Sequence, residues 1–497
     1  MSRTPQTSTP IRVALAVCIL ALASQMASPL SAATMTGWLS VVWGDPGPES
    51  KEASHLEFFL TASNGLATEL VISKTALATA GGLMAINQRF VEVVFEGDPS
   101  GLVKLRADSL RVLPSPDQPE SVATEAVLGS KPWVTLACKF SDKSIEPENL
   151  SYFQGMYDNA PGRLDHYWRE VSYDAIDIVG STAVNWKNLP NSHTYYVPTP
   201  GSGTTANLSQ LFQDCTAAAD PFIDFSLGSS GGYEGINLMF NDQLDCCAWG
   251  GSRWATLDGV SKSWRTTWDP PWAFAQEGVI AHEMGHGFGL PHANNSDGDT
   301  NPYDSPWDVM SSATGYAVND LVYGKLGKHV TSYHKDRLGW LEEGAEMFVV
   351  PGEGFFRVTI DPLGSATTST YRMARIPIGG SSSHYYTVEV REAVGNYEAA
   401  IPGTGGGDRM VIIHEVLIGR SEPAWVVDED DPPANYADTE GVMWRVGEMF
   451  VDPAAEIVIE VESQTATGFR VGILLGASMF GDGFESGDTS AWATSVP

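Results

Sequence analysis

The first part of the chain alternates apolar and polar residues over short runs. Leu56–Leu60, Glu69–Ser73 and Phe90–Phe95 each have the two-residue period of a half-buried strand. Turn-forming residues, among them an asparagine followed by glycine and several prolines, separate these runs. We therefore predict a small all-β N-terminal domain or propeptide over residues 34–110.

The rest of the chain divides by pattern and composition. Residues 111–130 contain three prolines and several polar residues, which predicts a linker. Strand and helix patterns mix over residues 131–350, which predicts an α/β domain. Residues 351–475 return to strand patterns and are expected to form a β-sandwich-like C-terminal domain. Residues 476–497 are an acidic tail rich in Gly and Ser.

Two helices are expected within residues 131–350. One helix is predicted from apolar residues that recur at helical spacing, namely Leu208, Leu211, Phe212, Cys215 and Ala219. The second is expected over residues 272–288, where the pattern again becomes helical.

Residues 1–33 have the composition of a signal peptide. Arg3 and Arg12 supply positive charge, Val13–Ala23 is an apolar run, and Ser31–Ala33 offers the small residues of a cleavage site. The apolar run is too short for a comfortable membrane span. We therefore expect a secreted protein, with the C-terminal tail as a candidate for association with the cell surface.

The charge balance narrows the class of partner. The chain has 61 acidic and 29 basic residues, a net charge of −32. Nucleic acids and anionic membranes are bound by clustered cations, so neither is an expected partner. The surplus carboxylates are suitable ligands for hard cations such as calcium. Nothing in the pattern indicates an oligomeric state.

Four cysteines remain after the predicted cleavage: Cys138, Cys215, Cys246 and Cys247. An even number in an oxidising compartment indicates two disulfides, with three connectivities open. Cys246 and Cys247 are expected to bond to different partners, because a disulfide between neighbours is strained. The alternative is a buried free thiol at one or more of these positions.

One segment combines the residue types of a zinc site. His282 and His286 are four residues apart, so a helix presents both imidazoles on one face. Gly289 suits the left-handed end of that helix, after which the chain can return His292 to the same ion. Three imidazoles leave one position open for a catalytic water. Glu283 is expected to be the general base that takes the proton of that water.

This extended motif resembles that of the metzincin metallopeptidases. The resemblance implies that residues 131–350 are an α/β catalytic domain with a twisted sheet, a backing helix and a zinc-site helix. Residues 208–219 are the candidate for the backing helix. It also implies a methionine turn, for which Met310 is the match, as an apolar floor beneath the ligands. Astacin- and serralysin-like members have a tyrosine two residues later, where this chain has Ser312, and Tyr316 is out of register.

Within the metzincins the chain is most similar to the gametolysin and immune inhibitor A group. The similarity rests on residues 133–142, 165–173 and 333–340, and continues at residues 386–391. The resemblance covers about residues 130–420.

Oxygen-bearing side chains fill the segment between His292 and Met310. Asp297, Asp299 and Asn301 occupy alternate positions, as ligands do in calcium loops. The later glycine and glutamate of an EF-hand are absent, and a solvated turn explains the segment equally well.

How such an enzyme would be kept latent is open. Residues 34–130 contain no cysteine, which excludes a cysteine ligand from this region. Phe95–Asp98 resembles the motif by which astacin propeptides bring an aspartate to zinc, although glycine, aspartate and proline also form ordinary turns. A permanent β domain is the third alternative.

The sequence therefore predicts a secreted zinc endopeptidase that acts on proteins or peptides. The substrate is expected to pair as an extended strand with a sheet edge near residues 235–240. Two alternatives are an inactive binding or adhesion protein with the same fold and a zinc hydrolase of a non-peptide bond.

Overall fold

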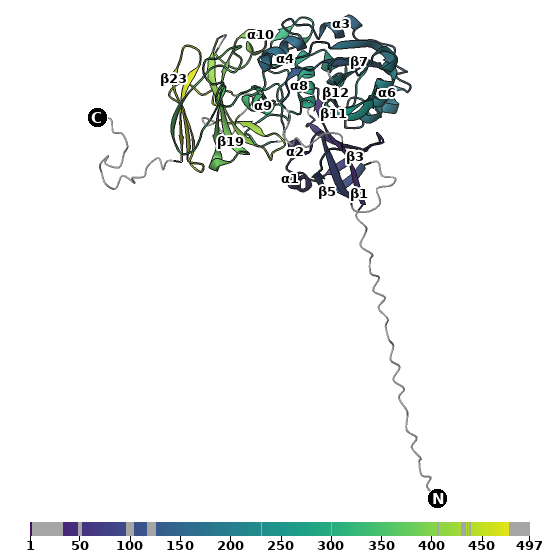
Figure 1. Ribbon diagram of the computed structural model, residues 1–497, viewed down its shortest axis with the longest axis horizontal. Helices are drawn as coiled ribbons and strands as arrows, with labels where there is room; N and C mark the ends of the chain where they lie inside the picture. The colour runs from purple at the N-terminus through teal and green to yellow at the C-terminus, as the bar shows by residue number, and fades with distance from the viewer. Residues whose placement is uncertain are drawn as a thin grey trace, which may run out of the picture.

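The computed structural model describes most of the chain (Figure 1). The described residues are 1, 33–47, 52–95, 104–116, 126–229, 231–299, 301–404, 407–428, 434, 436 and 439–476. Nearly all of the predicted signal peptide and C-terminal tail, as well as Asp98, lie outside the described residues. Among the described residues, no helix is long and apolar enough to cross a membrane.

The N-terminal residues form a closed barrel. Its strands are β1 (Ala33–Pro46), β2 (His55–Thr61), β3 (Ala67–Ile72), β4 (Arg89–Phe95) and β5 (Lys104–Val112). They lie in the order β2-β3-β5-β4-β1, and a pairing of β2 with β1 closes the ring. Alternate residues of β4, namely Val91, Val93 and Phe95, are buried in the barrel core. Helices α1 (Lys74–Thr79) and α2 (Leu83–Ile86) add side chains to the same core.

Strand β1 is long enough to belong to the barrel and to the next sheet. Its first half pairs with β4 and its middle with β2, whereas Val42–Pro46 pair antiparallel with β11 (Cys247–Leu257). The barrel and the central part of the molecule therefore share one ten-stranded sheet. Figure 1 shows the barrel strands β1, β3 and β5 next to β11 and β12.

The central part of this sheet is mostly parallel. Its spatial order is β11, β12 (Val260–Asp269), β10 (Gly235–Phe240), β7 (Trp133–Lys139) and β9 (Thr182–Asn188). Of these described strands, β11 runs antiparallel to its neighbour and the others run parallel. The expectation that residues 235–240 form a sheet edge is wrong. Every residue of β10 is buried between β12 and β7, as is typical of a central parallel strand.

Helices cover both faces of the central sheet. The helix predicted from its apolar spacing is confirmed as α6 (Leu208–Ala219), and its five predicted apolar residues are buried. It packs on one face with alternate residues of β7, while α4 (Leu164–Ser172) and α8 (Glu277–Gly287) pack on the other. The shorter helices are α3 (Leu150–Gly155), α5 (His193–Tyr196), η1 (Asp220–Phe222), α7 (Pro271–Phe274), α9 (Ser332–Arg337), η2 (Ile378–Gly380) and α10 (Gly395–Glu398). Two small ladders join β6 (Gly129–Ser130) to β8 (Ile176–Asp177) and β14 (Asn319–Asp320) to β15 (Gly324–Lys325).

The four cysteines form two disulfides. One joins Cys138 on β7 to Cys215 on α6, with 5.8 Å between the Cα atoms. The other joins Cys246 to Cys247. The expectation that these two neighbours bond to different partners is wrong. Cys138 and Cys215 face each other where helix α6 packs on the sheet, which leaves each of the adjacent cysteines with only the other.

The C-terminal residues form two sheets that share a hydrophobic core. The first has the order β13 (Asn294–Asn295), β21 (Ala424–Val426), β20 (Arg409–Leu417), β19 (His384–Glu392), β18 (Met373–Pro377) and β16 (Met347–Val349). The second has the order β17 (Gly354–Ile360), β24 (Phe469–Leu475), β23 (Ile457–Gln464) and β22 (Met449–Asp452). Val388, Ile413 and Ile459 belong to one cluster that spans both sheets. Because β13 follows His292 directly, this part of the molecule is attached to the predicted zinc site.

Candidate metal centre

Helix α8 and the turn that ends it position the three predicted histidines. Every residue of α8 is buried, and His282 and His286 lie one turn apart. Gly289 adopts φ +88°, the left-handed conformation expected of it. Its N–H donates to the carbonyl of His286 at 2.9 Å, and the N–H of Leu290 donates to the carbonyl of Gly285 at 3.0 Å. This pair of bonds is a Schellman ending, which turns the chain back toward His292.

The three imidazoles converge on one point. The Nε2 atom of His286 lies 3.1 Å from Nε2 of His282 and 3.2 Å from Nε2 of His292. The Nδ1 atom of His282 lies 2.7 Å from the carbonyl oxygen of Val309, and that of His286 lies 2.8 Å from that of Leu290. Each Nδ1 therefore carries the proton and donates it to a carbonyl, so that Nε2 keeps its lone pair.

This arrangement fits a bound cation. The lone pairs of His282 and His286 face each other at 3.1 Å, which is repulsive unless a positive charge lies between them. Burial lowers the pKa of His286 to about 3, so this imidazole is neutral, the form that binds metals. Three imidazole nitrogens in a buried site are a donor set that suits zinc.

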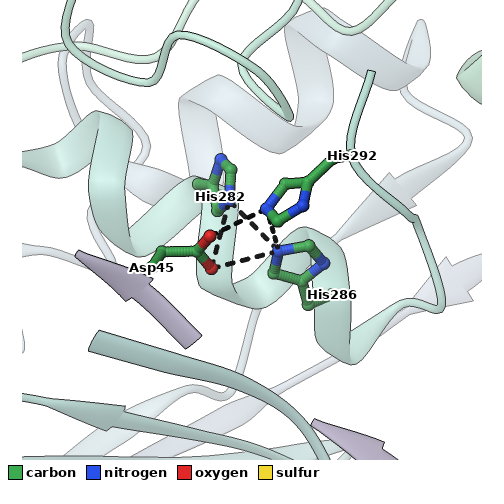
Figure 2. Close-up of side chains that lie close together, drawn as sticks. All are labelled: Asp45, His282, His286 and His292. Carbon is green, nitrogen blue, oxygen red and sulfur yellow. Dashed lines mark hydrogen bonds and ion pairs between the residues drawn. The ribbon is translucent and has the colours of Figure 1, made fainter. Parts of the chain in front are cut away.

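A fourth group, which the sequence analysis missed, lies among these nitrogens. The Oδ1 atom of Asp45 is 2.8 Å from Nε2 of His292, and its Oδ2 atom is 3.3 Å and 3.4 Å from those of His286 and His282 (Figure 2). Asp45 comes from the end of β1, in the N-terminal barrel. Burial alone would raise its pKa, but His292 and His282 hold the pKa well below its ordinary value. The four ligand atoms lie within 4.8 Å of one another.

Glu283 lies beside this group and is fully buried. Neither of its carboxylate oxygens has a hydrogen-bond partner among the described residues. It packs against Gly250 of β11, where an added Cβ would approach Oε2 of Glu283 to 2.6 Å. Burial raises the pKa of Glu283 well above its ordinary value, and the charges of Asp45 and Asp269 add to this effect. The carboxyl group is therefore in an environment where it can hold a proton.

Met310 lies on the far side of α8 from the sheet. Its side chain is fully buried, and a Cβ added at Gly285 would collide with its sulfur. The turn around it is held by Asp308, whose Oδ1 accepts from the N–H of Met310 at 2.7 Å. Because the neighbouring carbonyl of Val309 orients His282, this turn and the histidines are one connected unit.

Tyr303 is the second residue at the site that the sequence analysis missed. Its hydroxyl donates to Oδ1 of Asp45 at 2.6 Å, and its ring lies 5.5 Å from that of His292. Ser312 and Tyr316, the positions compared with the family pattern, both contact Tyr436 instead. Tyr303 precedes Met310 in the chain, so the position expected after the methionine could not reveal it.

A second acidic group lies close by. Carboxylate oxygens of Asp297, Asp299 and Asp304 lie within 4.8 Å of one another. The predicted calcium ligands Asp297 and Asp299 are thus brought together, and Asp304 joins them. The side-chain oxygen of Asn301 accepts from the N–H of Tyr303 at 3.2 Å.

A cavity of about 710 Å³ opens beside the histidines. Its wall includes Glu283, Tyr303 and the apolar side chains of Trp272 and Val279, and residues 311–315 also line it. The arrangement can thus hold a metal ion, a proton acceptor and a bound side chain next to one another.

A scan against protein-family models and searches of curated proteins and of solved structures each found no match.

Proposed function

We propose that the chain is a secreted zinc-dependent endopeptidase. The observation that carries this proposal is the convergence of three Nε2 atoms with a buried, unpartnered carboxylate beside them. Secretion rests on the signal peptide predicted from residues 1–33. His282, His286 and His292 would hold the zinc ion.

Glu283 acts as the general base and then as the general acid. Zinc at this site would polarise a carbonyl bond and lower the pKa of a water molecule to about 7. Glu283 takes a proton from the attacking water and delivers it to the nitrogen of the leaving amine. Its burial, which raises its pKa, allows the carboxyl to hold the proton between these two steps.

The shape of the site supports an extended substrate. The antiparallel strand β11 borders the site, and Gly250 on this strand contacts Glu283. The edge of β11 at Cys247–Gly251 is paired with β1, so a peptide could satisfy its backbone bonds along this edge only in place of β1. A side chain of that peptide would enter the cavity next to Trp272 and Val279.

The two alternatives place different demands on Glu283. A binding or adhesion protein has no need of a buried carboxylate without a partner, which costs free energy unless it has a role. A hydrolase of a non-peptide bond would use the same carboxylate but does not need a strand edge. The endopeptidase proposal accounts for both features.

The test compares Glu283→Ala and Glu283→Gln with the wild type. Because residues 34–110 were predicted to be a separate domain or a propeptide, each protein is purified as the secreted chain with a specific protease site inserted after Pro116. Hydrolysis of an unfolded protein substrate is then measured before and after the chain is cut at that site. We expect both variants to retain zinc and to lose activity by about 10²–10⁴-fold, the range for general acid–base catalysis. Chelation of the metal should abolish the wild-type activity.

Equal activity of the wild type and both variants would exclude the role of Glu283. If the cut, zinc-loaded wild type is inert toward peptides but hydrolyses an ester, the non-peptide alternative replaces this proposal. If it hydrolyses neither substrate, the binding-protein alternative does so.

A further inference from the structure

Asp45 completes a set of four donors at the metal centre. Its two oxygens reach the ligand nitrogens of all three histidines, and only 5% of the residue is exposed. Zinc in proteins is most often four-coordinate, and a catalytic zinc has three protein ligands and one open position. With Asp45 in place, the position needed for the attacking water is taken by a carboxylate.

The strand that carries Asp45 also covers the substrate-binding edge. Residues Val42–Pro46 pair antiparallel with Gly251–Cys247 of β11. This pairing uses the backbone groups that an extended peptide would need. A substrate strand and β1 therefore cannot occupy the edge of β11 together.

The side chains around Asp45 fit this position closely. The indole of Trp43 lies flat on the imidazole of His286, with 4.7 Å between ring centroids and 2° between planes. Gly44 packs on Trp249 so closely that a Cβ would overlap the indole. These contacts are specific to β1 and hold its carboxylate on the histidines.

Further contacts attach the barrel to the rest of the molecule. The side chain of Gln88 donates to the carbonyl of Gly287, at the end of α8, at 3.1 Å. The guanidinium of Arg253 on β11 lies 5.2 Å from the ring of Phe59 and is buried beneath the barrel. Backbone cleavage after Val112 would leave the barrel attached by such non-covalent contacts alone.

From these contacts we infer that the N-terminal barrel is an inhibitory domain, which supplies Asp45 as a fourth metal ligand and lays β1 along the substrate-binding edge of β11. This inference rests on the proposed endopeptidase function. It assigns the aspartate contact to Asp45 on β1. The competing explanation is a permanently closed structural zinc site, to which the same four ligands would belong.

The first experiment examines the ligand itself in the full-length chain. Asp45→Ala and Asp45→Asn are compared with the wild type, and Asp108→Asn, an exposed residue on β5 of the same barrel, is the control. Two measurements are made: the visible absorption of the cobalt-substituted protein, and the rate of zinc transfer to a chromophoric chelator. We expect Asp45→Ala to change the cobalt spectrum and to speed zinc transfer by at least about tenfold. An unchanged spectrum and transfer rate would overturn the inference.

The second experiment examines access to the site without catalysis. Glu283→Ala, carrying the protease site after Pro116, is mixed with a fluorescent peptide hydroxamate before and after cutting and separation of the barrel. We expect tight binding only after release of the barrel, because in the uncut chain, with or without Asp45→Ala, β1 still covers the edge of β11. Equal binding to the uncut and cut proteins, or no binding to either, would overturn inhibition by the barrel. If hydroxamate binding depends on release of the barrel, but the cut protein that retains Glu283 hydrolyses no peptide, only the endopeptidase proposal is contradicted.

A separate observation concerns the acidic group that follows His292. Asp304 is 7% exposed, and its Oδ1 atom has no hydrogen-bond partner among the described residues. One of its carboxylate oxygens lies within 4.8 Å of those of Asp297 and Asp299. No ion pair joins any of the three to a cation within the described part of the chain.

We infer that Asp297, Asp299 and Asp304 bind a calcium ion, a hard cation with oxygen ligands. Calcium binding to the full-length chain is measured by calorimetry, with Asp304→Asn as the variant and Asp108→Asn as the control. We expect the wild type and the control to bind calcium and to unfold at a higher temperature in its presence, and Asp304→Asn to lose both effects. Absence of binding to the wild type at millimolar calcium, or an unaffected Asp304→Asn, would overturn this site.

Discussion

At the residue scale, Asp308 shows how the turn beneath the histidines is held. Its Oδ2 atom accepts from the N–H of Thr331 at 2.9 Å and lies 2.7 Å from Nδ1 of His334. Its Oδ1 atom accepts from the N–H of Met310. Burial alone would raise the pKa of Asp308, but the imidazole of His334 and these hydrogen bonds lower it to about 2. One carboxylate thus joins the methionine turn to α9.

We expect Asp308→Asn to weaken the fold in a manner that depends on pH. A carboxyl group whose pKa is lower in the folded chain than in the unfolded chain stabilises the fold above the unfolded value. That stabilisation is lost as the pH falls through the folded value. The ordinary pKa is 3.8 and the folded value about 2, so the difference corresponds to about 2 kcal/mol.

Denaturant unfolding at a series of pH values tests this prediction. The free energy of unfolding of the wild type should exceed that of Asp308→Asn by about 2 kcal/mol between pH 5 and 7, and the gap should narrow from pH 4 to pH 2. Asp108→Asn, exposed on the barrel, should show no such gap. A gap that is constant with pH would contradict the proposed linkage.

The residues of the candidate site differ in how far the sequence could predict them. His282, Glu283 and His286 lie on one helix, and Gly289 returns His292 to them, so local geometry was enough to group them. Asp45 reaches the same point only because β1 pairs with β11. Such a pairing between distant segments leaves no spacing in the sequence by which it could be recognised.

At the element scale, local patterns predicted the elements better than their neighbours in space. The apolar spacing of residues 208–219 predicted α6, because a helix is defined by residues close in sequence. The strand at residues 235–240 was predicted, but its place in the sheet was not, because strand order depends on contacts between distant segments. The disulfide partners were unpredictable for the same reason, since Cys138 and Cys215 meet only when α6 packs on β7.

The end of α8 shows how one element passes its geometry to the site. The Schellman ending fixes the carbonyl of Leu290, which accepts the Nδ1 proton of His286. The same turn directs the chain toward His292. Gly289 has open space where a Cβ would lie, so its requirement is one of backbone conformation and not of packing. The glycine is therefore part of the ligand geometry although it binds nothing itself.

At the scale of the whole molecule, the three parts meet at the metal centre. The barrel contributes Asp45, the central part contributes the histidines, and the C-terminal sheet supports the methionine turn. This support comes from Arg391 on β19, whose Nη1 atom donates to the carbonyl of Trp307 at 2.5 Å. Glu389 on the same strand accepts from the N–H of Ser332 at 2.6 Å. The sequence suggested separate domains, but these buried contacts make the C-terminal sheet a structural part of the site.

Arg391 provides the test of this coupling. It is fully buried and forms ion pairs with Glu389 and Glu398. Arg391→Met leaves these two carboxylates buried without their cation, and we expect a loss of about 3–5 kcal/mol in the free energy of unfolding. Because the guanidinium also holds Trp307, zinc transfer to a chelator should become faster as well.

The control is Arg409→Met, which removes a half-buried ion pair with Glu392 on the same sheet. It should lower the free energy of unfolding by only up to about 1 kcal/mol and leave zinc transfer unchanged. Equal effects of the two substitutions would mean that the C-terminal sheet does not stabilise the metal centre through Arg391.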